Sequence, residues 1–269
     1  MKFMAKKTIT LSNGKSMEEP RSYALVVLII FLIATAISVE MTGFKLSVLI
    51  NRGDEFFLYL RNMLPPDVSY LSKIWNPLFD TIKMSLLGSA LGSLLAIPSA
   101  ILAASNVTKN KVILGFHRIF LSLVRTIPTL VVALIATYLL GLGTLAGTTA
   151  ITIFTYAYIG KLLYEQIETV DMGAFEAMEA MGGTRLDAFV SSVMPQILPS
   201  YISNCLFCFE GNVRYAAILG YVGAGGLGLI INEKLGWREY TSVGMILVML
   251  FITVAIIETM SHYIRKRLT

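Results

Sequence analysis

The chain has 269 residues, of which 55% are hydrophobic and only 14% are charged, and its mean hydropathy is +0.71. A soluble domain has about 45–50% apolar and about 25% charged residues. The composition therefore excludes a disordered chain and argues against a soluble enzyme or a nucleic-acid-binding protein. A chain of this length and hydropathy instead accommodates several membrane spans of about 20 residues each.

The net charge of +5 lies mainly at the two ends of the chain. Five basic and two acidic residues occur in residues 1–21, and Arg265, Lys266 and Arg267 lie close to the C-terminus. Basic residues beside apolar spans are typical of the cytoplasmic segments of membrane proteins. The charge therefore indicates membrane topology and not a nucleic-acid partner, and residues 1–21 are predicted to be a cytoplasmic basic tail.

Residues 22–39 form the first long apolar run and are predicted to be the first transmembrane helix. The alternative is a signal peptide, because Ala34-Thr35-Ala36 resembles a small-residue cleavage site. Residues 40–74 are mixed and polar, with equal numbers of acidic and basic residues, and are predicted to be an extracytoplasmic loop.

Five more apolar stretches follow, and residues 75–267 are predicted to form a core of membrane helices. Small residues four apart in the second span, at Gly88, Gly92 and Ala96, predict a close helix–helix contact. The sequence therefore predicts an all-α membrane protein with six transmembrane helices. The five stretches are Leu78–Ala104, Ile119–Leu142 with interruptions at Arg125 and Pro128, Thr144–Tyr164, Pro199–Val222 and Thr241–Tyr263.

With six spans, both termini are cytoplasmic, and three of the four cytoplasmic segments carry the basic residues that this orientation requires. The exception is the loop of residues 165–198, which has six acidic residues and one basic residue. Within it, Ala, Met and Glu favour a short helix that Gly182-Gly183 ends, followed by a second helix. An acidic face is poorly suited to anionic lipid, which favours a protein partner. A solvated loop between spans is an equally good alternative on physical grounds alone.

This loop resembles the EAA loop of ABC-importer permeases, in which Glu-Ala-Ala is followed by a glycine and later by a proline. Glu176, Ala177, Gly182 and Pro195 match that pattern, and Met178 replaces the second alanine. The resemblance implies a type I ABC-importer permease fold. It also implies that the loop, including Gly183, is a coupling segment that docks on a cytoplasmic ATPase.

A second resemblance is to the permeases of phosphonate transporters and covers roughly residues 75–267. It is carried by residues 209–214, by residues 219–228 and by the segment from Arg125 to Thr129. This resemblance implies an importer for phosphonate or a related phosphorus oxyanion, phosphite or phosphate. The glycine-rich part is shared more loosely with methionine-type permeases, so methionine or another small solute is the alternative cargo.

Three ionisable residues lie within the predicted spans, where charge is costly and marks candidates for function. Glu210 and Arg214 are four residues apart, so they share a helix face and are expected to pair. Arg125 precedes Pro128, where the helix is expected to kink. Guanidinium groups bind phosphate-like oxygens in a bidentate manner, so Arg125, Glu210 and Arg214 are candidates for an anion pathway. A purely structural pair between Glu210 and Arg214 is the alternative.

The segment from Gly223 to Gly228 contains a formal GxGxxG pattern. A dinucleotide site would need a preceding strand and a later acidic residue, and neither is expected here. Gly223, Gly225, Gly226 and Gly228 are therefore predicted to form an outer gate or a tight packing contact. No group of cysteine and histidine residues has the spacing of a metal site, so no metal is predicted.

The resemblance implies several partners in a bacterial inner (plasma) membrane. They are a second permease copy, two cytoplasmic ATPase subunits that hold ATP and Mg, an extracytoplasmic substrate-binding protein and an anionic small-molecule substrate. The chain itself has no Walker motif, so it is predicted to bind no cofactor and to perform no catalysis. A secondary transporter is the alternative from another class, although the two halves of the chain show no inverted repeat.

Overall fold

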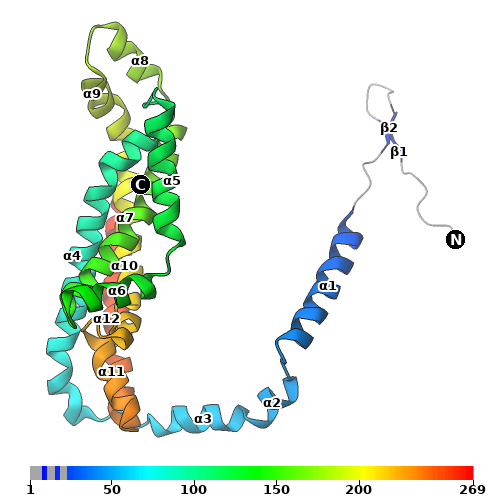
Figure 1. Ribbon diagram of the computed structural model, residues 1–269, viewed down its shortest axis with the longest axis vertical. Helices are drawn as coiled ribbons and strands as arrows, with labels where there is room; N and C mark the ends of the chain where they lie inside the picture. Colours follow the sequence, from blue (N-terminus) through cyan, green and yellow to red (C-terminus); the bar gives the residue numbers. More distant parts are fainter. Residues whose placement is uncertain (1–7, 11–15, 19–22, 269) are drawn as a thin grey trace. The chain divides into compact units, whose positions relative to one another are not determined.

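The computed structural model describes residues 8–10, 16–18 and 23–268, and the chain divides into two units, Met1–Leu58 and Tyr59–Thr269. Figure 1 shows the elements of both units. In the N-terminal unit, two strands of three residues pair in antiparallel register, with Thr8 opposite Glu18. The elements of this unit are β1 (Thr8–Thr10), β2 (Ser16–Glu18), α1 (Ala24–Met41) and α2 (Leu46–Asn51).

Helix α1 corresponds to the predicted first span at residues 22–39. It has 18 residues with a mean hydropathy of 2.6, and none of them is buried by other parts of the chain. An apolar helix with no buried residue has no protein core to cover it, which is the property expected of a helix surrounded by lipid.

The segment 40–74 differs from the predicted loop because much of it is helical. Besides α2, it contains α3 (Gly53–Asn62), the 3₁₀-helix η1 (Val68–Tyr70) and the start of the next long helix. Asp54 and Glu55 lie in the first turn of α3 and Arg61 in its last turn, which complements the helix dipole. The same charge pattern is visible in the sequence, but α3 has only 10 residues and was therefore not predicted as a helix.

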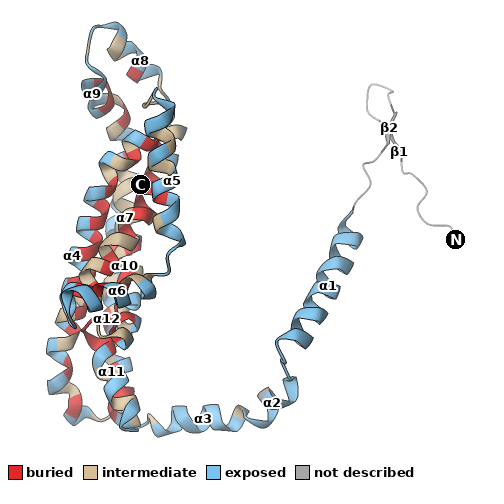
Figure 2. Ribbon diagram, viewed as in Figure 1, coloured by how far each residue is buried: buried red, intermediate tan, exposed pale blue. Residues whose placement is uncertain are grey.

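The C-terminal unit is a helical bundle in which α7 (Thr144–Thr169) lies in contact with four other helices. Buried residues lie where these helices face one another, and exposed residues cover the outer faces (Figure 2). Those four neighbours are α4 (Leu71–Ala103), α5 (Lys111–Thr126), α6 (Thr129–Leu140) and α10 (Met194–Leu219).

The predicted small-residue face of the second span is the surface of α4 that packs on α7. A Cβ at Gly88 would lie 2.7 Å from the side chain of Ile151, and one at Gly92 would lie 2.6 Å from the carbonyl oxygen of Thr152. Ala96 is fully buried and contributes to the same contact. The absence of side chains therefore lets the two backbones approach closely, as the spacing predicted.

The predicted third span is not one straight helix. α5 and α6 meet at Pro128 with a bend of 87°, and Ile127 is extended, as expected for a residue before proline. α5 also begins at Lys111, well before the predicted start at Ile119. The kink expected at Pro128 is therefore a complete break between two helices.

Two short helical segments flank α10, and two further helices follow them. The π-helix η2 (Phe189–Val193) leads into α10, and the 3₁₀-helix η3 (Gly220–Val222) follows it. α11 (Leu227–Gly236) then precedes α12 (Tyr240–Leu268) and lies in a segment that was predicted only as a connection.

The number of six spans is not confirmed. Among the described residues, three helical segments are long and apolar enough to cross a membrane, and two bent helix pairs raise the number to five. α7 is not among them because threonine, glycine and alanine lower its hydropathy. These small and hydroxylated residues contact other helices, so the helix does not need large apolar side chains.

Candidate functional site

The predicted coupling segment forms a helical hairpin at one end of the bundle, opposite the end that carries α11 (Figure 1). Its arms are α8 (Gly173–Ala180) and α9 (Arg185–Ala188), which we call the coupling hairpin. Gly182 has a φ of +91°, a left-handed conformation that favours glycine and ends α8. The Thr184 hydroxyl accepts the backbone N–H of Asp187, and this capping box begins α9.

One face of the coupling hairpin is buried against the bundle. Phe175 and Phe189 lie in a hydrophobic cluster with Ile167 of α7 and Ala104, which follows α4. Met178 packs against this cluster, which explains why a larger residue stands where alanine is usual. The hairpin is therefore fixed to the ends of α4 and α7.

The hairpin also carries two large, exposed apolar side chains that were not predicted from the sequence. Met181 is 75% exposed and Leu186 is 73% exposed, on either side of the glycine turn. Glu176, Ala177 and Gly182 are exposed on the same hairpin, and Pro195 is exposed in the first turn of α10. Because the glycine turn decides where Met181 and Leu186 point, helical periodicity alone could not identify them.

Much of the acidic charge of residues 165–198 is compensated within the chain. Glu179 pairs with Arg185 across the glycine turn at 3.0 Å, Glu165 pairs with Lys161 at 3.3 Å, and Glu168 pairs with Arg118. The loop as a whole is therefore less acidic than the amino-acid count suggested, because Lys161 and Arg118 lie outside it. On the hairpin itself, the two exposed apolar side chains are the more distinctive feature.

Glu210 and Arg214 of α10 form the ion pair that their spacing predicts. The carboxylate side chain is only 5% exposed, whereas the Arg214 side chain is 55% exposed. Arg265 of α12 lies 3.4 Å from the second carboxylate oxygen of Glu210. The sequence predicts only a topological role for Arg265, because a contact across 55 residues leaves no local signal.

Arg125 lies in the last turn of α5, next to the break at Pro128. Its side chain lines a cavity of about 220 Å³ together with Phe154 and Tyr158 of α7. The structure does not join Arg125 to Glu210 or Arg214, and no ion pair of the described residues includes it. Phe154 also contacts Tyr215, the neighbour of Arg214, with ring centroids 5.8 Å apart.

The glycine segment is folded tightly against the rest of the bundle. Gly223, Gly225 and Gly226 have positive φ values, and the N–H of Gly143 donates to the carbonyl of Gly223 at 2.9 Å. Gly228 packs its backbone against Ala217. These glycines therefore lie in close backbone contact with neighbouring segments.

A buried polar cluster in the bundle was also missed. The Asn212 amide donates to Ser89 of α4 and to Thr155 of α7, both at 2.8 Å. Ser85 donates to the carbonyl of Asn212 at 3.3 Å. Satisfied buried amides of this kind fix the register of packed helices. Isolated serines and asparagines in apolar runs gave no sign that they would meet.

Among the residues that the structure describes, no group of three His, Cys, Asp or Glu side chains that could hold a metal ion is present. The candidate site has two parts. One is the coupling hairpin at one end of the bundle, and the other is formed by Arg125 and the Glu210–Arg214 ion pair inside the bundle.

Comparisons with known proteins place the chain in a family. The model of the binding-protein-dependent transport system inner membrane component matches residues 96–269. Phosphate-import permease protein PhnE of Mycolicibacterium smegmatis is 34% identical over 207 residues, which are 77% of this chain and 39% of that protein. Phosphite transport system permease protein PtxC of Stutzerimonas stutzeri is 31% identical over 203 residues, 76% of this chain and 74% of that protein.

The chain thus spans less than half the length of the first of these relatives and about three quarters of the second. The inward-facing MetNI methionine ABC transporter has a chain of the same fold, with a TM-score of 0.66 and 21% identity. The match covers 76% of this chain and 99% of that chain. The resemblance to ABC-importer permeases is therefore confirmed, and this chain belongs to the family of inner membrane components of binding-protein-dependent transport systems, with a type I ABC-importer permease fold.

Proposed function

We propose that this chain is the permease subunit of an ATP-driven importer for phosphonate or a related phosphorus oxyanion, phosphite or phosphate. Two copies form one pathway across a bacterial inner membrane, with both termini in the cytoplasm. Two ATPase subunits, which hold ATP and Mg, dock on the coupling hairpins, and an extracytoplasmic binding protein delivers the anion. The permease itself performs no covalent chemistry.

The observation that carries the proposal is the coupling hairpin with its exposed apolar tip. Large apolar side chains on an otherwise polar surface mark a protein contact. The buried face of the hairpin holds it against α4 and α7, so a movement of the docked ATPase is transmitted to the bundle. The phosphorus oxyanion is supported by the similarity to phosphate and phosphite permeases and by the position of Arg125 beside a cavity.

Replacing Met181 or Leu186 by aspartate is expected to weaken ATPase binding by at least about 30-fold, because burying a charge at the centre of an interface costs about 2 kcal/mol or more. The measurement is the amount of ATPase that copurifies with the permease. Val112→Asp is the matched control, since Val112 is 79% exposed and does not belong to the coupling hairpin. Normal copurification of both hairpin variants would contradict the docking proposal.

Replacing Arg125 or Arg214 by alanine is expected to reduce phosphonate uptake by about tenfold, because a hydrogen bond to a charged group is worth about 1.5–3 kcal/mol. Uptake is measured in vesicles that contain the assembled transporter. Arg125→Lys keeps the charge and is expected to lose less activity. Lys83→Ala is the control, because Lys83 is an exposed residue that pairs only with Asp80 on its own helix. Undiminished uptake by both arginine variants in an assembled complex would remove these residues from the pathway.

A further inference from the structure

Glu168 is the acidic residue of residues 165–198 with the most partners from distant parts of the chain. Its carboxylate accepts the backbone N–H of Ser105 at 2.7 Å, and it also accepts the Ser105 hydroxyl and the Arg118 guanidinium. Ser105 follows α4, Arg118 lies in α5, and Glu168 lies at the end of α7. One carboxylate therefore joins three helices that meet at the same end of the bundle.

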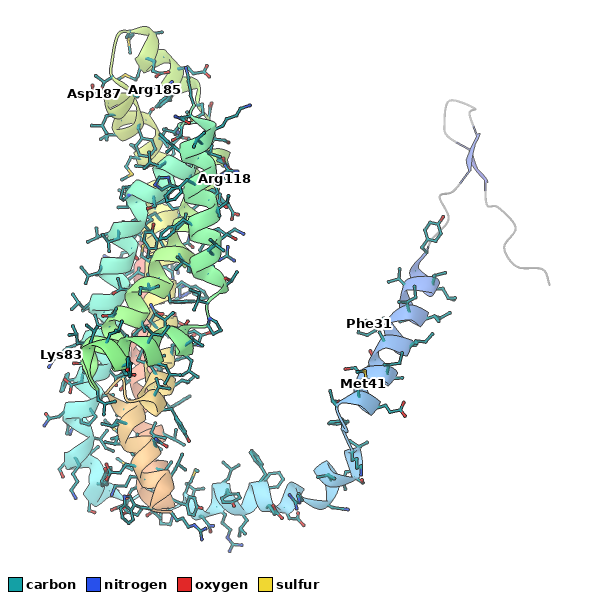
Figure 3. All side chains as sticks on the ribbon, viewed as in Figure 1. Phe31, Met41, Lys83, Arg118, Arg185 and Asp187 are labelled. Carbon is teal, nitrogen blue, oxygen red and sulfur yellow. The ribbon has the colours of Figure 1, made fainter. Side chains whose placement is uncertain are left out.

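Arg118 extends this connection. Its Nε donates to the carbonyl of Ala103 at 2.9 Å, in the last turn of α4. Its guanidinium also lies over the ring of Tyr164 in α7, 5.2 Å from the ring centroid. Figure 3 places Arg118 toward the end of the bundle that carries Arg185 and Asp187, with Lys83 toward the other end.

The connection between α4 and α5 is also bound to the coupling hairpin. The Asn106 amide donates to the carbonyl of Ile167 at 2.6 Å, and Arg185 of α9 donates to the carbonyl of Val107 at 3.2 Å. Residues 104–110 therefore lie between the hairpin and the helix ends and contact both.

Glu168 is charged at neutral pH. Burial acts to raise the pKa of its carboxyl, but the two Ser105 hydrogen bonds and the Arg118 charge together outweigh burial and hold the pKa below its usual value. The carboxylate and guanidinium side chains are 25% and 35% exposed, so water screens this ion pair less than a surface pair. By contrast, the ion pair of Glu165 is with Lys161 on its own helix.

We propose that Glu168 is a positioning residue for energy coupling. By fastening the α4–α5 connection to the end of α7, it makes the coupling hairpin and the ends of α4, α5 and α7 move as one body. Only residues 170–172 separate α7 from α8. The fastening by Glu168 adds to the hydrophobic cluster under the hairpin, so that a pull on the hairpin moves the helix ends more and bends that short link less. The inference rests on the proposed docking of an ATPase at the hairpin.

The test is the number of substrate ions imported for each ATP hydrolysed, measured in vesicles that contain the complete transporter and its binding protein. Coupling between distant sites corresponds to factors of about 5 to 150. Glu168→Gln is therefore expected to lower this ratio at least about fivefold. The ratio does not depend on how much protein folds, so a purely structural loss would not change it.

Glu165→Gln is the matched control, because it removes the same charge from the same helix, and its ratio is expected to equal that of the wild type. An unchanged ratio in Glu168→Gln, or an equal decrease in Glu165→Gln, would overturn the proposal. If Glu168→Gln does not assemble, Arg118→Gln is measured against the same criteria, because it leaves the Ser105 bonds intact. Failure of both variants to assemble would make the ion pair a folding requirement and would also overturn the proposal. Failure of the proposed function would appear differently, as a wild-type permease that binds no ATPase.

Discussion

Replacing Gly228 by alanine is expected to destabilise the folded protein strongly. A Cβ at this position would overlap the carbonyl oxygen of Ala217 and would lie 2.8 Å from the Cα of Gly220. Both neighbours are backbone atoms in helical segments, so no side-chain rotation relieves the overlap. We expect destabilisation of at least about 3 kcal/mol, the upper range for overpacking of a core. Thermal unfolding of the protein purified in detergent measures it.

Gly211→Ala is the matched control for this prediction. Gly211 lies in the interior of α10, and a Cβ there would meet nothing within 4 Å. Alanine lowers the entropy cost of forming a helix, so this variant is expected to gain about 0.5–1 kcal/mol. Equal stability of Gly228→Ala and the wild type would show that the backbone contact around Gly220 is not as close as described.

Replacing Glu210 by alanine is expected to destabilise the bundle by about 1.5–3 kcal/mol, the range for a hydrogen bond to a charged group. The loss leaves Arg214, which is 55% exposed, and Arg265, which is 24% exposed, without their shared carboxylate. Here Glu210 contacts two arginines, Arg214 on its own helix and Arg265 on α12, so its loss also removes a link between α10 and α12. The measurement is the unfolding temperature of the purified protein in detergent.

The control is Asp80→Ala, which removes a carboxylate from the ion pair with Lys83. That pair lies within one helix, at 3.7 Å, and both side chains are substantially exposed. Exposed pairs contribute at most about 1 kcal/mol, so only a small change is expected. If Glu210→Ala were as stable as Asp80→Ala, the buried triad would contribute little to folding, and a role in the pathway would become its main explanation.

The parts of the fold that sequence could predict are those that depend on neighbouring residues. Small residues four apart predicted the face of α4 that packs on α7, and the four-residue spacing of Glu210 and Arg214 predicted their ion pair. Gly182-Gly183 predicted where the first arm of the coupling hairpin ends. In each case the helix repeat or a glycine turn fixes the geometry locally.

The remaining features depend on contacts between distant segments. The contact of Arg265 with Glu210 and the hydrogen bonds of Asn212 require α12, α4 and α7 to be placed around α10. The 87° bend at Pro128 is another example, because a proline predicts a break but not the direction of the next helix. Sequence patterns therefore predict contacts between neighbouring residues, but they do not predict which distant residues a side chain will contact.

The composition of α7 has a consequence for how the protein enters the membrane. Its threonine, glycine and alanine residues suit contact with other helices, but they give little free energy of transfer from water to lipid. α4 precedes α7 in the chain and supplies the surface that receives Ile151 and Thr155. We therefore expect stable insertion of α7 to depend on α4, which precedes it in the order of synthesis.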